Sequence, residues 1–385
     1  LAGAPVMSSV AKVLVIGAGI GGLTAGIALR QQGVLVDLIE IAPTLAVYGV
    51  GIIQPNNTLR ALDRIGLAQA CVDIGAPFPG WEILDREGTS LMKAPSPNSA
   101  APQFPPVNGI TRPQLHTILT DAAQSHGVNV ILGASVEQFE ADATGVDVTF
   151  ADGTRGRYDL VIASDGINSA TRRQVFGNDF EPKFTGQGVW RYNLPRPADM
   201  DWGQIWFGSA SKVGLVPLSP TMMYMFVVTA EPGNPWHEGP GLADTMRERI
   251  AEYGGLLKEL APLIDDPAQV VYKPMHNVLL PPPWNKGRIV VIGDAAHATT
   301  PHLAQGAAMA IEDAVLLAEL LGGDGTIKEQ LAEFSARRVP RGKFVVDAST
   351  QLAQWELEAW SGVHNPDADP GGFLHASTEK LMEAY

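Results

Sequence analysis

A glycine-rich turn near the amino terminus is the feature that most constrains this chain. Residues 12–40 read as strand, glycine turn, helix and strand, and Gly17, Gly19 and Gly22 form the spacing G-x-G-x-x-G. Glycine at these positions allows a tight turn, close approach of the backbone to a pyrophosphate, and close packing of helix on strand. Glu40 ends the second strand, 18 residues beyond Gly22, where its carboxylate can accept hydrogen bonds from ribose hydroxyls. The pattern predicts a βαβ unit that binds a dinucleotide, and it leaves the identity of that dinucleotide open.

Composition excludes several classes of function. The 385 residues carry 41 acidic and 27 basic side chains, a formal charge of −14, which repels phosphate backbones and anionic membranes. We therefore expect no nucleic-acid partner and no membrane association. The lone cysteine, Cys71, suits a reducing cytoplasm, and no secretory signal pattern opens the sequence, so we expect a cytoplasmic protein. Neither His-x-Glu nor Cys-x-x-Cys spacings occur, so no metal site is expected.

Two further strand ends carry carboxylates. The segment DLVIASDGINSATRR runs from a predicted strand into Asp165 and Gly166, and IVVIGDAAHATTPHLAQG runs from another strand into Asp294. An aspartate just past a sheet strand can hold a ribose or ribityl hydroxyl, and the first N–H groups of a helix beginning at Gly306 can face a ring that carries negative charge. Because the chain has a single G-x-G-x-x-G turn, any nicotinamide must bind transiently and share the site of a flavin.

The chain resembles a known enzyme family over about residues 13–338. Its segments GAGIGGL with Glu40, YGVGIIQPNNTLRALDRIGL, TRPQLHTIL, SDGINSATRR and GDAAHATTPHLAQGAAMAIEDA resemble, in order and spacing, those of the single-component FAD-dependent aromatic hydroxylases, which include para-hydroxybenzoate, salicylate and 6-hydroxynicotinate hydroxylases. One departure is Ala304, where many members carry glycine. The resemblance implies cofactor-binding roles for Gly17, Gly19, Gly22, Glu40, Gly51, Arg112, Asp165, Gly166, Asp294, Gly306 and Ala307.

The resemblance also implies what these residues would do. The glycine turn and Glu40 would hold the ADP half of FAD, and Asp294 would bind the ribityl chain. The peptides of Gly306 and Ala307 would face the pyrimidine edge of the flavin. Asp165 and Gly166 would belong to a motif tied to both FAD and NAD(P)H binding.

An α/β fold is expected, with a Rossmann-like FAD-binding domain, a second β-sheet domain for substrate, and C-terminal helices. We predict a discontinuous FAD-binding domain at 7–77, 107–184 and 276–322, a substrate-binding domain at 78–106 and 185–275, and a helical segment at 323–385. The second region is rich in strand patterns, with one helix expected near 242–259. Four strands between 128 and 163 are expected mostly as hairpins, and residues 95–106 as a surface loop.

Candidates for contact with substrate are few, and each has a plainer alternative. We predict catalytic roles for Pro301 and His302, although His302 can equally be a surface or capping histidine. Arg191 can bind an anionic substrate or pair with a carboxylate, since an arginine between apolar neighbours needs a partner. Tyr192 then points to the opposite face of the strand.

Several aromatic, sulfur and imidazole side chains complete the set. Trp206, Met223 and Tyr224 are candidate substrate contacts, with ordinary core packing as the alternative. We expect His297 to have a structural role, and we expect His116, four residues after Arg112, to lie on the solvent side of its helix.

The functional hypothesis that follows from the resemblance is a monooxygenase with FAD as cofactor and NAD(P)H as co-substrate. It would hydroxylate a small phenolic or heteroaromatic molecule through a C4a-hydroperoxyflavin, acting as a monomer or homodimer. The same fold can instead perform epoxidation, Baeyer–Villiger insertion or another oxidation of a natural product. A non-catalytic dinucleotide-binding redox sensor is the remaining alternative.

Overall fold

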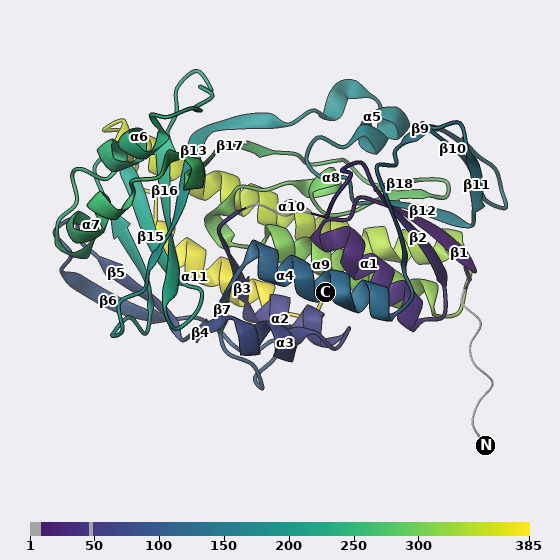
Figure 1. Ribbon diagram of the computed structural model, residues 1–385, viewed down its shortest axis with the longest axis horizontal. Helices are drawn as coiled ribbons and strands as arrows, with labels where there is room; N and C mark the ends of the chain where they lie inside the picture. Colours follow the sequence, from purple (N-terminus) through teal and green to yellow (C-terminus); the bar gives the residue numbers. More distant parts are fainter. Residues whose placement is uncertain (1–8, 46–48) are drawn as a thin grey trace.

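The molecule has two halves, and a mostly parallel sheet forms the centre of the half that contains β1 and β2 (Figure 1). The computed structural model describes residues 9–45 and 49–385, so residues 7 and 8 of the predicted first domain and Tyr48 of the YGVGIIQ segment lie outside the described residues. The strand order is β18-β19-β12-β1-β2-β8, and all pairs except β18 with β19 are parallel. The strands are β1 (Lys12–Ile16), β2 (Leu35–Glu40), β8 (Asn129–Leu132), β12 (Leu160–Ala163), β18 (Asn285–Lys286) and β19 (Ile289–Val291).

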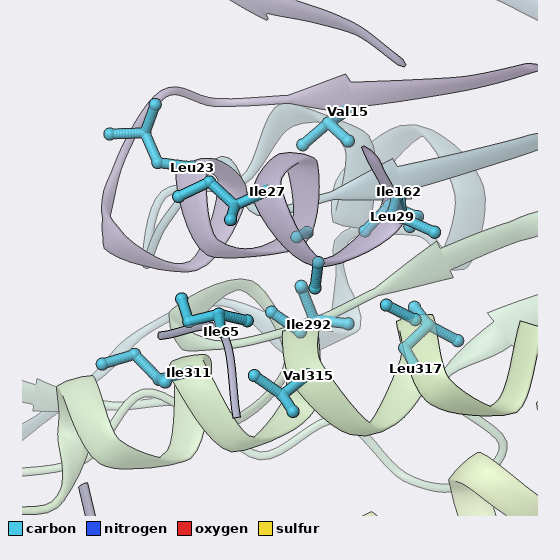
Figure 2. Packing of buried hydrophobic residues seen from close by; sticks show 14 of the residues in the cluster. Val15, Leu23, Ile27, Leu29, Ile65, Ile162, Ile292, Ile311, Val315 and Leu317 are labelled. Carbon is cyan, nitrogen blue, oxygen red and sulfur yellow. The ribbon is translucent and has the colours of Figure 1, made fainter. Parts of the chain in front are cut away.

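Helices α1 (Ile20–Gln31), α4 (Arg112–Ser125) and α9 (Gly306–Leu321) pack together beside this sheet. Figure 2 shows Leu23 and Ile27 of α1 above Ile311 and Val315 of α9, all of them buried. Each fully buried aliphatic side chain of this kind contributes roughly 1.5–3 kcal/mol relative to exposure. The strands β1 and β12 are buried almost throughout, which is typical of a parallel sheet covered on both faces.

The second sheet has seven strands in the order β17-β13-β16-β15-β14-β5-β6. They are β5 (Gly80–Leu84), β6 (Ser90–Pro95), β13 (Lys183–Pro195), β14 (Gly203–Phe207), β15 (Ser211–Pro217), β16 (Met222–Ala230) and β17 (Val271–Asn277). These strands come from the two segments assigned to substrate binding. The single helix expected there is two, α6 (Leu242–Arg249) and α7 (Gly255–Leu260), because the chain leaves α6 in a turn and starts α7 anew at its N-cap, Gly254.

The expectation of hairpins between residues 128 and 163 is half right. Strands β9 (Val136–Ala141), β10 (Val146–Phe150) and β11 (Arg155–Tyr158) form an antiparallel three-stranded sheet. The flanking strands β8 and β12 instead pair in parallel with β2 and β1. Short apolar runs of this kind fit either arrangement, and only their long-range partners decide between them.

The remaining elements connect the two halves. A third sheet has the order β3-β7-β4, with β3 (Gly51–Pro55), β4 (Ala76–Phe78) and β7 (Val107–Thr111), and its strands β4 and β7 contact β15. The other helices are α2 (Asn56–Asp63), α3 (Ala68–Ile74), α5 (Ala170–Phe176), α8 (Asp294–His297) and α11 (Pro370–Leu381). Helix α10 (Ile327–Trp360) starts at a capping box made by Thr326 and Glu329. It contacts α9, which packs beside the first sheet, and β13 of the second sheet, so it links the two halves (Figure 1). In the described part of the chain, no helix combines the length and apolar character needed to cross a lipid bilayer.

Candidate functional site

The glycines of the G-x-G-x-x-G turn have different reasons to lack a side chain. Gly17 has φ +100°, and a Cβ there would lie 2.5 Å from the carbonyl oxygen of Ser164. A Cβ at Gly22 would lie 1.8 Å from the carbonyl oxygen of Gly17. A Cβ at Gly19 would instead meet no atom within 4 Å and would point into open space. Gly17 and Gly22 are therefore required by the protein's own packing, whereas Gly19 leaves room for an approaching ligand.

Two side chains hold this turn in place. The N–H of Ala18 donates to Glu40 Oε2 at 2.9 Å, and the N–H of Ala42 donates to Glu40 Oε1 at 2.9 Å. His116 Nε2 donates to the carbonyl oxygen of Ala18 at 2.9 Å. The prediction that His116 faces solvent is wrong, because α4 packs on α1 and leaves this side chain only 7% exposed.

The three carboxylate-bearing strand ends meet at one edge of the parallel sheet. Strands β2, β1, β12 and β19 are neighbours in that order, with Ile39 opposite Ile16, Ile16 opposite Ala163 and Ala163 opposite Val291. A Cβ at Gly21 would lie 2.6 Å from Ser164 Oγ and 3.3 Å from Ala310 Cβ, and a Cβ at Gly293 would lie 3.1 Å from that same Ala310 Cβ. The glycine turn, the Asp165 segment, the Asp294 turn and α9 therefore converge.

Asp165 is engaged within its own segment. Its carboxylate accepts hydrogen bonds from the Ser169 hydroxyl and from the N–H of Thr171 at 3.0 Å, which caps the start of α5. Gly166 follows with φ +78°, a conformation that favours glycine. The buried Arg172 of α5 donates to the carbonyl oxygen of Ala295 at 2.9 Å, so α5 also braces the Asp294 turn.

Asp294 lies beside the amino end of α9. Its Oδ1 is 4.0 Å from the place where a Cβ of Gly306 would be, and Arg112 is close enough to favour its ionised form. Part of the Asp294 side chain is exposed to solvent. The surrounding protein atoms still remove much of the water around its carboxyl, and this desolvation raises its pKa. The first N–H groups of α9, at Gly306 and Ala307, have no side-chain cap from Gln305. Such a helix end is suited to a ligand that carries negative charge.

The turn just before α9 contains the departure noted at Ala304. This alanine has φ +54°, which is the left-handed region where glycine is favoured. The glycine found in many family members at this position therefore suits the backbone better, and the alanine retains the conformation at a cost of about 1 kcal/mol.

A buried charge network fixes the Asp294 turn from behind. Asp313 Oδ2 accepts from the N–H of Gly293 at 2.9 Å and from His297 Nε2 at 2.6 Å, and its Oδ1 accepts from Arg338 Nε at 2.6 Å. Burial alone would raise the pKa of Asp313, but the charges of His297 and Arg338 hold it well below its usual range. The structural role expected for His297 is confirmed, and the ring also packs on Trp284 at 4.8 Å.

We expect Asp294→Asn to stabilise the FAD-free protein and to weaken FAD binding. Because the folded protein raises the pKa of this carboxyl, ionisation costs stability as pH rises from the usual value of 3.8 through the folded value. The uncharged amide removes that cost at neutral pH, but it would lose one acceptor for the ribityl hydroxyls that the family resemblance assigns to this residue. Melting temperatures of FAD-free samples at pH 5 and pH 8, with flavin titrations, check both parts. A melting temperature below that of the parent at pH 8 would contradict the first.

The two faces of the seven-stranded sheet separate the substrate candidates. Trp206 and Met223 belong to a buried cluster with Tyr192 and the side chains of α6 and α7. Arg191 and Tyr224 occupy the other face, because successive side chains of a strand alternate. The expectation that Tyr192 points away from Arg191 is confirmed. For Trp206 and Met223 the structure thus shows the core packing that was stated as the alternative, on the face of the sheet away from Arg191.

Arg191 and Tyr224 lie close enough to Arg112 to be affected by its charge, and the same is true of Asp294. Burial and the nearby Arg112 lower the pKa of Arg191 to about 10, and burial raises the pKa of Tyr224 to about 12. Within the described residues, neither the guanidinium nor the phenol makes a hydrogen bond or an ion pair with another group. Gly51 lies under Tyr224, since a Cβ there would be 2.2 Å from Tyr224 Cδ1. Packing between the two layers therefore accounts for glycine at position 51.

His302 and Pro301 occupy a short 3-10 helix, Pro301–Leu303, before α9. Pro301 is exposed. The His302 side chain is 1% exposed, and its ring nitrogens contact Thr300 Oγ1 at 2.8 Å and Glu356 Oε2 at 3.0 Å. This environment gives His302 a bridging position between elements, with no free nitrogen for a substrate.

Comparisons with known proteins agree with this geometry. Residues 10–349 match a family model described as "FAD binding domain". The aurachin C monooxygenase/isomerase of Stigmatella aurantiaca is 31% identical over 89% of this chain and 90% of its own length. The 6-hydroxynicotinate 3-monooxygenase of Bordetella bronchiseptica is 29% identical over 93% of this chain and 96% of its own length.

A solved structure of a related protein has a similar fold. Klebsiella pneumoniae HpxO, crystallised with FAD and uric acid, superposes with a TM-score of 0.77 at 25% identity, covering 97% of this chain and 93% of HpxO. The converging strand ends and these likenesses together show that the chain is an FAD-dependent monooxygenase of the single-component FAD-dependent aromatic hydroxylase family.

Proposed function

We propose that this protein uses NAD(P)H and O₂ to hydroxylate a phenolic or heteroaromatic small molecule that carries an anionic oxygen. The observation that carries the proposal is the position of Arg191. Its guanidinium has no carboxylate partner in the described part of the chain, and it lies close enough to Arg112 to be affected by its charge. A partly buried guanidinium without an anionic partner is costly unless a ligand supplies the missing anion.

The residues of the chain would prepare the ring for oxidation. Arg191 would bind the oxygen of a phenol or hydroxy-heteroarene, favour its ionised form and so increase the electron density of the ring. The Tyr224 hydroxyl would donate a second hydrogen bond. FAD, when bound, would pass two electrons from NAD(P)H to O₂ and deliver one oxygen atom to the ring.

Relatives support an aromatic substrate through their names. One relative is named for 6-hydroxynicotinate, and HpxO was crystallised with uric acid. Both compounds are nitrogen heterocycles with acidic protons, which fits a site that offers a guanidinium. Epoxidation or Baeyer–Villiger insertion would use the same cofactor site, and the structure of the product distinguishes these reactions. A redox sensor would bind FAD without net oxidation of any added compound.

The experiment is a coupled assay of the FAD-loaded protein. NADH or NADPH oxidation is followed with 6-hydroxynicotinate, urate, salicylate and para-hydroxybenzoate, and products are analysed by mass spectrometry under ¹⁸O₂. Stimulated oxidation and a product heavier by one ¹⁸O atom support the proposal. Hydrogen peroxide as the sole product with every compound would count against it. Light scattering of the same samples tests the proposed monomer or homodimer.

Arg191→Met tests the role of the guanidinium. We expect the KM for the accepted anionic substrate to rise about 10- to 100-fold, since hydrogen bonds to charged groups contribute about 1.5–3 kcal/mol. The free energy of unfolding should stay unchanged or rise, because the substitution removes an unpaired charge. Arg196→Met is the matched control: Arg196 donates to the carbonyl oxygens of Met200 and Ser219, so its loss should lower stability and leave KM unchanged. An unaltered KM in Arg191→Met would contradict the assignment.

A further inference from the structure

A largely buried carboxylate near the end of α10, that of Glu356, joins three separate parts of the fold. Glu356 Oε1 accepts from Lys212 Nζ of β15, in an ion pair with both side chains nearly buried. Its Oε2 accepts from Gln187 Nε2 of β13 at 3.0 Å and from His302 Nε2 at 3.0 Å. Glu356 therefore connects two strands of the second sheet to the turn that precedes α9.

Each partner of Glu356 is a hydrogen-bond donor. Burial lowers the pKa of His302, and this effect outweighs the attraction of Glu356, so the ring is neutral with its proton on Nε2. Thr300 then donates its hydroxyl proton to Nδ1 of the same ring. Burial alone would raise the pKa of Glu356, but the charge of Lys212 and the hydrogen bonds from Lys212 and His302 hold it below its usual value. The carboxylate is thus ionised at neutral pH and accepts from three sides.

Lys212, a partner of Glu356, lies on the same face of the sheet as Arg191, the residue proposed to bind substrate. Lys212 stands opposite Val228, and Val228 stands opposite Val189. One step further along the same strands, Arg191 stands opposite Phe226 on the same face of the sheet. On the other side, His302 precedes Gly306, the first residue of α9, by four positions. The carboxylate thereby spans the gap between the sheet that carries Arg191 and the helix end beside Asp294.

We propose that Glu356 is a positioning residue that sets the distance between the substrate-binding sheet and the flavin-facing end of α9. This inference rests on the proposed function. In the coupled reaction, NAD(P)H, H⁺ and O₂ convert the ring C–H to C–OH and yield NAD(P)⁺ and water. When the ring is displaced, the same two electrons reduce O₂ to H₂O₂ and the ring leaves unchanged. Displacement by about 1 Å lowers the rate of an aligned step by up to about 100-fold.

Glu356→Gln in the FAD-loaded protein tests this proposal. The glutamine amide has only one acceptor oxygen, and its NH₂ group would face one of the donors that now bind Glu356. With a probe aromatic that the parent hydroxylates, we expect kcat for product to fall about 10-fold or more, with a smaller change in KM, and peroxide to take up most of the NAD(P)H oxidised. Lys212→Met should act in the same direction, and the double variant should be little worse than Glu356→Gln alone. Glu356→Asp, which keeps the charge, should recover part of the coupling.

The matched control is Glu358→Gln on the same helix, where the carboxylate bonds only to the side chains of Gln354 and Asn365 within the described residues. It should leave the share of peroxide unchanged. Hydrogen exchange of peptides covering residues 209–217 and 299–305 should be faster in Glu356→Gln and unchanged in the control.

Two outcomes separate the possible failures. An unchanged ratio of product to peroxide in Glu356→Gln, alongside an active parent, would overturn the positioning role even if the melting temperature fell. Absence of product in the parent, with any probe, would overturn the proposed function. The exchange data would then show whether Glu356 still joins the two segments.

Discussion

Gly19→Ala is expected to leave the fold intact and to weaken FAD binding by about 10- to 100-fold. The backbone at Gly19, with φ −75° and ψ −175°, is accessible to alanine, and the added methyl meets no protein atom within 4 Å. The methyl would instead occupy the space through which a pyrophosphate approaches the first N–H groups of α1. Losing one or two such charge-assisted hydrogen bonds costs about 1.5–3 kcal/mol, which corresponds to that range of affinity.

The control for this prediction lies in the same turn. In Gly22→Ala the Cβ would lie 1.8 Å from the carbonyl oxygen of Gly17, so the backbone must move. We expect the free energy of unfolding to fall by about 3 kcal/mol, with flavin binding lost as a consequence. Urea unfolding of FAD-free samples and flavin fluorescence titrations separate the two effects. Unaltered FAD affinity in Gly19→Ala would show that the cofactor does not approach this turn.

Arg338→Met is expected to lower the free energy of unfolding by about 3–5 kcal/mol. Arg338 is fully buried and donates to Asp313 at 2.6 Å and to Glu312 at 2.8 Å. Methionine nearly fills the space of the side-chain stem but leaves two buried carboxylates with fewer donors, and an uncompensated buried charge is the costly part of a broken pair. Because Asp313 also holds the N–H of Gly293, the Asp294 turn should loosen and FAD affinity should fall as well.

The pH dependence of this variant has a definite sign. The folded protein holds the pKa of Asp313 below its usual value of 3.8. This group therefore contributes stability above about pH 4, and the contribution is lost as pH falls through the folded pKa. Removing Arg338 should shift acid unfolding to higher pH. The neighbouring Arg337→Met is the matched control, because Arg337 is exposed, and it should cost less than about 1 kcal/mol. Equal unfolding midpoints for the two variants would contradict the network.

The sequence predicted the local geometry of the cofactor segments. The glycine spacing, the acid at a strand end and the start of α9 at Gly306 can each be recognised in a short stretch of sequence. This is possible because the backbone conformation of a turn or helix start depends on neighbours a few residues away. His116 shows where that reasoning stops. The pattern of apolar residues along α4 did not predict that this histidine is buried. Its hydrogen bond to Ala18, 98 positions earlier in the sequence, exists only because α4 packs on α1.

The substrate candidates separate in the same way. Alternation along β13 correctly placed Arg191 and Tyr192 on opposite faces, since that alternation is local. Local pattern does not tell which face of the sheet meets the cofactor segments and which meets α6 and α7. It therefore left Trp206 and Met223 open between substrate contact and core packing, and the structure places both in a core cluster. Nor does any short motif mark Glu356 as the partner of Lys212 and His302.

By itself, then, the sequence determined the turns, the helix starts and the kind of ligand that their N–H groups and carboxylates suit. The tertiary structure alone decided which charges are buried together and which side chains face the site. The physical reason is that backbone conformation and helix-end polarity are set over a few residues, whereas desolvation and pairing depend on groups that only the folded chain brings within 3 Å of each other.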